Sequence, residues 1–260
     1  MAEGEFKTIL VPPTDPIVLN LDGKGIQTAG LSSGVRFDFG GNGVTQNTGW
    51  IAPGSGFLVL DRNGSGRVAA QRRGTHRRTP CGCNGVIDNG TELFGNNTPL
   101  YDAAGKITGY AANGQAALAA LDTNHDGVIN SLDAGFANLK IWQDTNQDGI
   151  CQPGELQTLA QLGITGINVG MTAIDPLSSA AALTGGNQLG ATGAFTRADG
   201  TTGVAADINL TLNPLSHSFS NAIPVIAAAQ ALPTLDSGTI YTTVNMTAAN
   251  DAVFEMWREA

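Results

Sequence analysis

The sequence predicts an α+β fold in which short strands surround a helical region between residues 111 and 162. Three observations lead to this prediction. Short β-rich runs separated by Gly and Asn turns occupy residues 17–21, 35–39 and 57–60. Apolar residues at helical spacing follow, at Ala116, Leu118, Leu121, Phe136, Leu139 and Trp142, with a third helical piece at 155–162. Strand-like runs return at residues 164–169, 194–197 and 208–212.

Composition and charge exclude some classes of function. Of 260 residues, 42% are hydrophobic and 13% charged, enough for one large domain or two small ones. Lys and Arg number 13 against 22 Asp and Glu, so the formal net charge is −9. A nucleic-acid groove needs clustered cations, so we expect no nucleic-acid partner, whereas an acidic surface attracts divalent cations. Hydropathy predicts no membrane-spanning segment, and residues 1–10 lack the basic and apolar parts of a signal peptide.

Two tandem segments, residues 122–133 and 144–155, carry the strongest motif. A twelve-residue calcium loop needs oxygen ligands at positions 1, 3, 5, 9 and 12, a backbone carbonyl at position 7 and Gly at position 6. The first loop supplies Asp122, Asn124, Asp126, the Val128 carbonyl, Asn130 and Asp133. The second supplies Asp144, Asn146, Asp148, the Ile150 carbonyl, Gln152 and a bidentate Glu155. The sequence therefore predicts two Ca²⁺ sites; the alternative is a pair of Asx-rich turns that hold no metal.

The spacing of the loops suggests how they are arranged. Their starts lie 22 residues apart (144 minus 122), closer than in a standard EF-hand pair and similar to the loop–helix repeats of dockerins. Position 8 is Ile129 in one loop and Cys151 in the other, and both residues suit a short buried β-contact between paired loops. We therefore expect the helical region to carry tandem EF-hand/dockerin-like loops.

A third calcium loop is interrupted by an Arg-rich stretch, residues 67–84. If residues 66–84 are removed, the segment that begins at Asp61 continues at Gly85, and Asp61, Asn63, Asp88 and Glu92 share one site. The stretch itself holds five of the thirteen cations and is expected to be a disordered surface insert. Two weaker copies of the motif begin at Asn20 and Asp38.

The dipeptide Asp15-Pro16 has unusual chemistry. Because Pro lacks an N–H, the succinimide route is closed. The remaining route is attack by the Asp15 carboxylate on its own backbone carbonyl, which forms an anhydride and expels the proline nitrogen. That reaction needs an aligned carboxylate, a proton donor for the leaving nitrogen and stabilisation of the oxyanion. A second Asp-Pro dipeptide, Asp175-Pro176, is interpreted as a turn.

Many sequence blocks in order resemble one family. The blocks DPIVLNLDGKGIQT, GVRFDFGGNGV, GWIAPGSGFLVLDRNG, GVIDNGTELFGNNT, AALAALDTNHDGVIN, NLKIWQDTNQDGI, GELQTLAQLGI and FTRADGTTG resemble the self-processing modules of iron-regulated RTX proteins of the FrpC type. The resemblance spans residues 15–214, apart from the stretch at 67–84. It implies that calcium folds the module and triggers cleavage of the Asp15-Pro16 bond, followed by transfer of the aspartyl group to water or to a lysine amine. It also implies type I secretion and an extracellular location.

Some positions depart from the family. Its members usually carry acids where this chain has Asn20, Lys24 and Gly40, so the sites nearest Asp15 are expected to be weakened. We divide the chain into an N-terminal arm at 1–14, a calcium-binding module of the self-processing type at 15–215 and a C-terminal extension at 216–260, with a short helix at 251–258.

Two functions remain open from the sequence. The first is a secreted calcium-binding module that cleaves itself once, with Asp15 as nucleophile and Pro16 as leaving group, and that uses a lysine-bearing acceptor protein as a partner. The alternative is a non-catalytic, calcium-dependent structural or interaction module of an adhesin or toxin, including a dockerin-like module that binds a partner through exposed helical faces.

Overall fold

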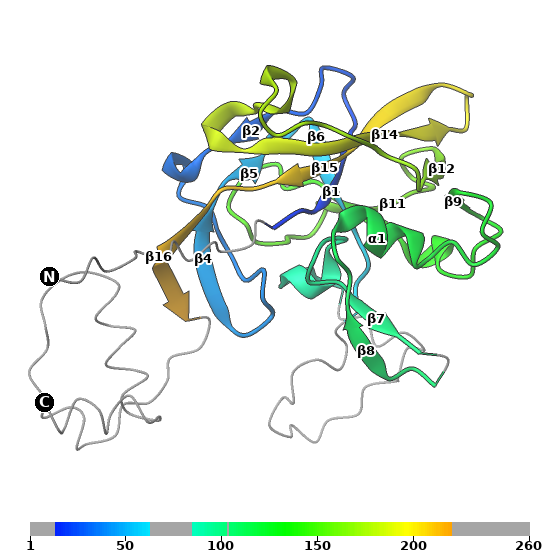
Figure 1. Cartoon of the computed structure of the whole chain (residues 1–260), viewed down its shortest axis with the longest axis horizontal. Coiled ribbons are helices and arrows are strands. Elements are labelled where there is room, and N and C mark those ends of the chain that lie inside the picture. Colours follow the sequence, from blue (N-terminus) through cyan, green and yellow to red (C-terminus); the bar gives the residue numbers. More distant parts are fainter. Residues whose placement is uncertain (1–13, 63–84, 103, 220–260) are drawn as a thin grey trace, which may run out of the picture.

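The computed structural model describes residues 14–62, 85–102 and 104–219, and the regular secondary structure of these residues is mostly β-strand (Figure 1). The largest sheet is antiparallel and has nine strands. Its strands are β1 (Ile17–Asn20), β6 (Ser55–Val59), β9 (Val128–Asn130), β10 (Lys140–Trp142), β11 (Leu156–Thr158), β12 (Ile164–Asn168), β13 (Thr172–Ala173), β14 (Gln188–Arg197) and β15 (Thr202–Asn209). They are arranged in the order β11-β10-β6-β1-β15-β14-β12-β9, and β13 pairs with β14.

Three smaller sheets complete the described part of the chain. One has three strands in the order β16-β4-β3, and the other two are the pairs β2-β5 and β7-β8. Their bounds are β2 (Thr28–Ala29), β3 (Arg36–Phe37), β4 (Val44–Thr48), β5 (Trp50–Ile51), β7 (Pro99–Tyr101), β8 (Ile107–Tyr110) and β16 (Leu212–Phe219). Short 3₁₀ turns lie at Leu31–Ser33, Gly90–Glu92, Phe136–Asn138, Ser179–Ala181 and Thr184–Gly186.

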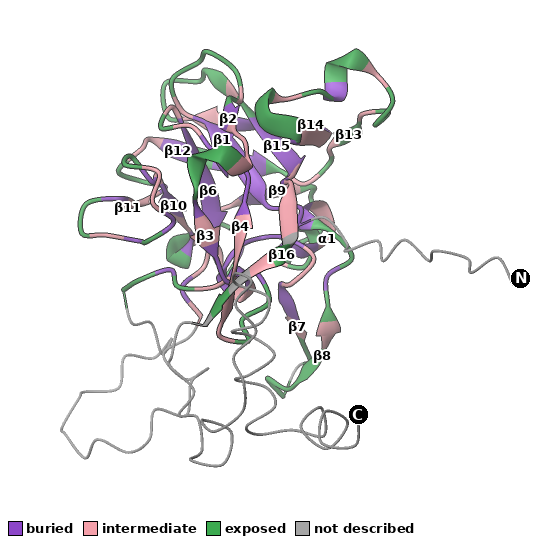
Figure 2. Cartoon of the chain, turned by 90° about the vertical axis from the view of Figure 1, so that its left-hand side faces the viewer, coloured by how far each residue is buried: buried purple, intermediate pink, exposed green. Residues whose placement is uncertain are grey.

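Strand β1 is buried on both faces at the centre of the large sheet (Figure 2). Successive side chains of a strand point to opposite faces. Ile17 and Leu19 accordingly pack in one hydrophobic cluster with Leu58, and Val18 packs in a second cluster with Trp50. Full burial of such an aliphatic side chain contributes about 1.5–3 kcal/mol, so the start of the strand is firmly anchored.

The predicted α+β fold class is wrong, because the structure is mostly β. Among the described residues the α-helix is α1, Gly114–Ala119, which has only six residues. The helix expected around Trp142 is instead a 3₁₀ turn followed by β10, and the helical piece expected at 155–162 contains β11. An EF-hand arrangement of helix, loop and helix is therefore not present in this part of the chain.

The misleading signal has a physical cause. Leu139 and Ile141 pack in the first hydrophobic cluster and Trp142 packs in the second. A strand buried on both faces has apolar residues without strict alternation. Over a short run, such residues can also fall at helical spacing.

The strands expected from the sequence are found in the structure. Those at 17–21, 35–39, 57–60 and 164–169 correspond to β1, β3, β6 and β12, and those at 194–197 and 208–212 overlap β14 and the end of β15. Residues 1–13, the Arg-rich stretch at 67–84 and the helix expected at 251–258 lie outside the described residues. Over the part of the chain that is described, none of the helices has the length and apolar character that crossing a membrane requires.

Candidate functional site

Asp15 lies where the chain enters the large sheet, and the end of β15 together with Leu210, the residue after it, holds the residues on both sides of Asp15. The Leu210 amide donates to the Thr14 carbonyl at 3.0 Å, and the Ile208 amide donates to the Pro16 carbonyl at 3.1 Å. Asp15 is 9% exposed, and Pro16 is buried. The Asp15-Pro16 bond is therefore clamped in extended conformation inside the protein rather than displayed in a surface loop.

A segment between Leu93 and Thr98 covers Asp15. The Asn96 amide donates to Oδ1 of Asp15 at 2.7 Å, and the Phe94 carbonyl accepts from the Ile17 amide at 2.8 Å. The segment is closed on itself because the Thr98 hydroxyl donates to the Leu93 carbonyl at 2.7 Å and accepts from the Gly95 amide at 2.9 Å. The Asn96 amide thus restrains one oxygen of the buried Asp15 carboxylate.

Two glycines make room for the backbone of Asp15. A Cβ at Gly114 would lie 2.7 Å from the Asp15 carbonyl oxygen, and one at Gly95 would lie 3.3 Å from it. Gly114 begins α1, whose N-cap is Asn113: the Asn113 side chain accepts from the Ala116 amide at 2.7 Å. The helix therefore starts directly against the candidate scissile bond.

A second buried carboxylate, Asp207, lies on the neighbouring strand. Asp207 is 5% exposed and pairs with Ile17 in the β1–β15 ladder. Burial raises the pKa of Asp15 to about 6, against the opposing effect of the Asn96 amide. Burial, and after it the nearby Asp15 carboxylate, raises the pKa of Asp207 to about 7. Two acids that share a site in this way resist being ionised together.

The other Asp-Pro dipeptide has a different environment. Asp175 and Pro176 are exposed, and the Leu177 amide donates to Oδ1 of Asp175 at 2.9 Å. The Ser178 amide donates to the Asp175 carbonyl. The turn expected from the sequence is confirmed, and it provides an internal contrast to Asp15.

The two tandem loops have the same internal geometry. In each, the first Asp accepts from the amide of the Gly at position 6: Gly127 to Asp122 at 2.9 Å, and Gly149 to Asp144 at 2.8 Å. Both glycines have positive φ, 83° and 75°. The turn therefore requires the backbone freedom of glycine at this position.

The last acid of each loop closes it back onto position 2. Oδ1 of Asp133 accepts from the Thr123 amide at 2.7 Å, and Oε1 of Glu155 accepts from the Thr145 amide at 3.1 Å. The other carboxylate oxygen accepts from the position-9 amide, Asn130 in the first loop and Gln152 in the second. These bonds bring each loop's first and last acids to the same turn.

The interrupted loop is closed in the same way across the Arg-rich stretch. The Gly85 amide donates to Oδ2 of Asp61 at 2.8 Å, and Gly85 has a φ of 84°. The Arg62 amide donates to Oε1 of Glu92 at 3.1 Å. Gly85 thus stands at position 6, as expected if the loop continues there, and Asp61 and Glu92 come together. Asn63 lies outside the described residues, and the Asp88 amide donates to Oε2 of Glu92.

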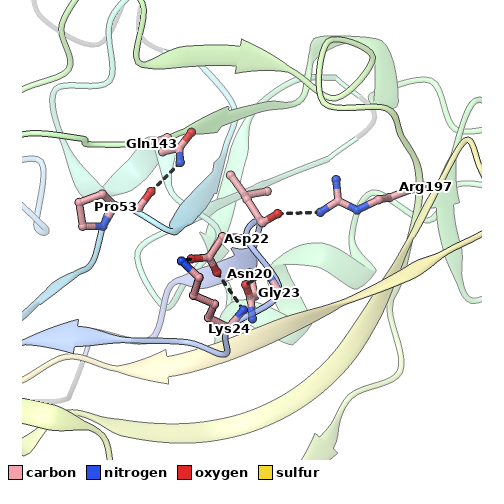
Figure 3. Close-up of polar contacts among 8 residues, drawn as sticks. Asn20, Asp22, Gly23, Lys24, Pro53, Gln143 and Arg197 are labelled. Carbon is pink, nitrogen blue, oxygen red and sulfur yellow. Dashed lines mark hydrogen bonds and ion pairs between the residues drawn. The ribbon is translucent and has the colours of Figure 1, made fainter.

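The two weaker copies differ from each other. Asp38 accepts from the Asn42 and Gly43 amides and so follows the loop pattern, but position 3 is Gly40 and offers no side-chain oxygen. The segment from Asn20 forms a turn in which Lys24 is paired with Asp22 at 3.6 Å (Figure 3). That turn has a cation where the pattern needs a ligand.

The turn after Asn20 is held by other parts of the chain. Figure 3 shows Arg197 pointing toward it, and the Nη2 atom donates to the Leu21 carbonyl at 3.0 Å. Nearby, the Gln143 side chain donates to the Pro53 carbonyl at 2.5 Å. Polar contacts between side chain and backbone therefore fix the far end of β1, opposite Asp15.

The expected β-contact between Ile129 and Cys151 is wrong. Ile129 pairs with Ile167 of β12 and packs in the first hydrophobic cluster, whereas Cys151 packs in the second. The loops are attached to different parts of the molecule because each joins its own strand of the large sheet. Cys151 is buried, as a small hydrophobic residue would be.

The oxygen-rich loops fit a hard cation. The described residues contain no group of three or more His, Cys, Asp or Glu side chains arranged to hold a metal by themselves. Calcium, however, also takes amide and backbone carbonyl oxygens, which both tandem loops offer in addition to their acids. Burial raises the pKa of Asp144, and burial with the Asp88 carboxylate raises the pKa of Glu92 to about 7. Arg62 interacts electrostatically with Glu92 and the Trp50 indole donates to Asp144, but neither carboxylate forms a salt bridge in the described part of the chain.

The loops adjoin the elements that contact Asp15. Glu92, the last acid of the interrupted loop, directly precedes the covering segment 93–98. Helix α1 ends two residues before the first tandem loop, and the Asp122 amide donates to the Ala119 carbonyl at 3.2 Å. These two loops are therefore joined directly to segments on both sides of the Asp15 pocket.

Comparison with known proteins identifies the family of the chain. The family model of the SPM domain matches residues 17–73 and 81–211. The chain belongs to the SPM domain family. The SPM chain is also 39% identical over 215 residues to the iron-regulated protein FrpA of Neisseria meningitidis serogroup C. That alignment covers 82% of this chain and 17% of FrpA, so the SPM chain spans a small part of the relative's length.

Asp207 is the site residue that the sequence analysis missed. It stands between Ala206 and Ile208, in a run of otherwise small or apolar residues that pairs with β1. The sequence alone could have indicated Asp207 as a candidate site residue, because charged residues are seldom buried without a partner.

Proposed function

We propose that this SPM chain is a calcium-binding module of a secreted RTX-type protein and that it cleaves its own Asp15-Pro16 bond. The observation that carries the proposal is the 2.7 Å hydrogen bond from the Asn96 amide to Oδ1 of Asp15, in a pocket that also clamps the Asp15 backbone. The resemblance to self-processing modules and the membership of the SPM family agree with it.

The pocket supports one requirement of the chemistry, an aligned carboxylate. The carboxylate of Asp15 attacks the carbonyl carbon of the same residue, the bond to the Pro16 nitrogen breaks, and a cyclic anhydride forms on Asp15. Restricting the carboxylate to one orientation raises its effective concentration at the carbonyl. Water or a lysine amine then opens the anhydride.

Calcium would be held by the two tandem loops and by the loop of Asp61, Asp88 and Glu92. When bound, it would supply the positive charge that lets these acids lie together, so that the loops fold. Asn96 and Gly114 belong to segments adjoining the loops. We therefore expect calcium-free protein to hold Asp15 less firmly and to cleave slowly or not at all.

The test is the intact mass of protein purified in chelator and then given millimolar calcium. We expect loss of residues 1–15 and a product of 245 residues (260 minus 15) that begins at Pro16. The Asp15→Ala variant should bind calcium and stay intact. Asp175-Pro176 is the matched internal control, because ordinary acid hydrolysis would cut both Asp-Pro bonds, whereas the proposed reaction cuts only the first.

A non-catalytic, calcium-dependent structural module is the second candidate. It is favoured by the loops alone, which share their geometry whether or not Asp15 reacts. An unchanged mass together with calcium-induced folding would support this candidate instead. A dockerin-like version is not proposed, because strands β10 and β11 stand where its helices were expected.

A further inference from the structure

Asp207 has no role in the reaction as written above, yet it lies beside it. The bridge between Thr14 and Leu210 continues the register that pairs Ile17 with Asp207. In that register Asp15 is diagonal to Asp207 on one face of the ladder, and diagonal neighbours are about 7–8 Å apart at Cα, within reach of their side chains. The side chain of Asp207 therefore projects on the side where the Asp15 carboxylate lies.

The surroundings of this pair hold no other ionisable side chain. The covering segment 93–98 reads LFGNNT, α1 reads GQAALA and β1 reads IVLN. Strand β14 also packs against Asp207, since a Cβ at Gly190 would lie 3.6 Å from Oδ1 of Asp207, and the charged residue of β14, Arg197, contacts Leu21 at the far end of β1. The backbone amides of Gly114 and Gln115 oppose the rise in the pKa of Asp207. Among the described residues, no cation forms an ion pair with either carboxylate. A buried acid pair in this position costs stability, so it calls for a functional reason.

We propose that Asp207 is the acid that donates a proton to the Pro16 nitrogen as the Asp15-Pro16 bond breaks. The proposal rests on the cleavage proposed above and names the proton donor for it. Expulsion of an amine from a peptide bond requires protonation of the nitrogen, because the unprotonated amide anion is a very poor leaving group.

The step balances in atoms and charge. An oxygen of the ionised Asp15 carboxylate bonds to the Asp15 carbonyl carbon, and the electron pair of the C–N bond passes to the Pro16 nitrogen. That nitrogen takes the proton of neutral Asp207 and becomes a secondary amine. The products are a neutral anhydride and an ionised Asp207. When water opens the anhydride, Asp207 can take a proton from that water.

The charge of the pair explains why two acids suit this pocket. Before the step the pair carries one negative charge, on Asp15, and afterwards one negative charge, on Asp207. The pocket therefore holds one negative charge both before and after the step, and the reaction adds no further charge to it. Burial raises the pKa of both carboxyls, to about 6 for Asp15 and about 7 for Asp207, so the pair retains a proton close to neutral pH. The hydrogen bond from the Asn96 amide to Oδ1 of Asp15 favours the arrangement in which Asp15 carries the negative charge. As the two groups are coupled, these values describe the pair.

The experiment compares the parent with Asp207→Asn and Asp207→Glu in the full chain. Each protein is purified in chelator and given saturating calcium, and the appearance of the chain that begins at Pro16 is followed by intact mass from pH 5 to pH 9. Tryptophan fluorescence at each pH reports whether the variant has folded with calcium. Asn matches Asp in shape but has no acidic proton, whereas Glu keeps one.

The parent is expected to show a bell-shaped pH dependence, rising as Asp15 ionises and falling as Asp207 loses its proton. Asp207→Asn should fold with calcium and cleave about 10²–10⁴-fold more slowly, without the alkaline fall. Asp207→Glu should keep cleavage with a displaced alkaline limb. A merely structural role would not move that limb.

Two results would overturn the proposal. If Asp207→Asn folds and cleaves at the parent's rate with the parent's alkaline limb, Asp207 is not the acid, and self-cleavage itself stands. If the parent stays intact while calcium folds it, both the cleavage and the role of Asp207 are refuted.

Discussion

The indole Nε1 of Trp50 donates to Oδ2 of Asp144 at 2.7 Å, which joins the first acid of the second tandem loop, residues 144–155, to the aromatic core. Trp142 approaches the other end of that loop, where its Nε1 donates to Oε2 of Glu155 at 3.4 Å. The two rings are stacked edge to face, 5.5 Å apart between centroids. A change in the charge of this loop therefore alters the surroundings of two buried tryptophan rings.

Calcium titration should change tryptophan fluorescence through the second loop. Glu155→Gln removes one charge from a proposed bidentate ligand, so we expect the calcium concentration at the midpoint of the fluorescence change to rise on the order of tenfold or more. The measurement is best made with Trp257→Phe, so that only Trp50 and Trp142 contribute.

Asp133→Asn is the matched control for the first loop. Asp133 stands at the same loop position but contacts the Thr123 and Asn130 amides and no tryptophan. It should leave the fluorescence midpoint near that of the parent. Equal shifts in both variants would mean that the signal follows global folding rather than the second loop.

Gly114→Ala should slow cleavage. Alanine normally stabilises a helix by about 0.5–1 kcal/mol relative to glycine, but here its Cβ would lie 2.7 Å from the Asp15 carbonyl oxygen. Displacing that carbonyl by even 1 Å can cost roughly 10²-fold in rate. Gly109→Ala is the control, because a Cβ there has no atom within 4 Å. A parental rate in Gly114→Ala, measured by intact mass, would contradict the close approach.

Thr98→Val should loosen the segment that covers Asp15. The substitution keeps the shape but removes a hydroxyl that serves both the Gly95 amide and the Leu93 carbonyl. Leaving buried groups unpaired costs about 1–3 kcal/mol, which urea denaturation would measure as a lower free energy of unfolding. The exposed Thr108, whose hydroxyl contacts the Leu100 carbonyl at 3.3 Å, is the matched position for a Val substitution with little effect.

The buried acid at Asp207 should make stability fall as pH rises. Its folded pKa, about 7, is above the ordinary value of 3.8, so between these values the folded state binds more protons than the unfolded state. The free energy of unfolding should then decrease from about pH 4 to pH 7, by roughly 2–4 kcal/mol at about 1.4 kcal/mol per pKa unit.

The comparison is made in proteins that cannot cleave. Asp15→Asn retains the burial of Asp207, and the double variant with Asp207→Asn removes the titrating group. The double variant should lose much of the pH dependence in denaturant titrations at pH 4 to 8. If the two curves run parallel, the carboxyl of Asp207 is not the group that titrates.

Deleting residues 66–84 should strengthen calcium binding at the proposed site of Asp61, Asp88 and Glu92. Ser65 would then join Gly85, which already donates to Asp61. Each doubling of a closed loop costs about 0.6 kcal/mol. Shortening the connection from 22 residues (63–84) to three (63–65) should therefore strengthen binding roughly tenfold, as seen by calorimetric titration. Weaker binding after the deletion would show that the stretch contributes to the site.

The local motifs were predictable because they follow from few neighbouring residues. Gly85, Gly127 and Gly149 all adopt positive φ at position 6 of their loops, as the spacing alone predicts. The fold class was not predictable in the same way, because the apolar residues around Trp142 fit either a helix or a strand that is buried on both faces. Asp207 was missed because its significance depends on pairing with β1, about 190 residues away in sequence (207 minus 17).

The ladder that clamps the Asp15-Pro16 bond also has a consequence after the bond opens. In the proposed cleavage, Pro16 would stay bound to the Ile208 amide and lead into the central strand, while Thr14 would hold the other end beside Leu210. The freed amine and the reactive acyl group would therefore remain neighbours, and recombination would compete with every other outcome. Whether cleavage becomes irreversible would then depend on how fast the N-terminal peptide dissociates. A force on that peptide, or a partner that binds it, would set the yield of cleaved protein without changing the rate of the chemical step.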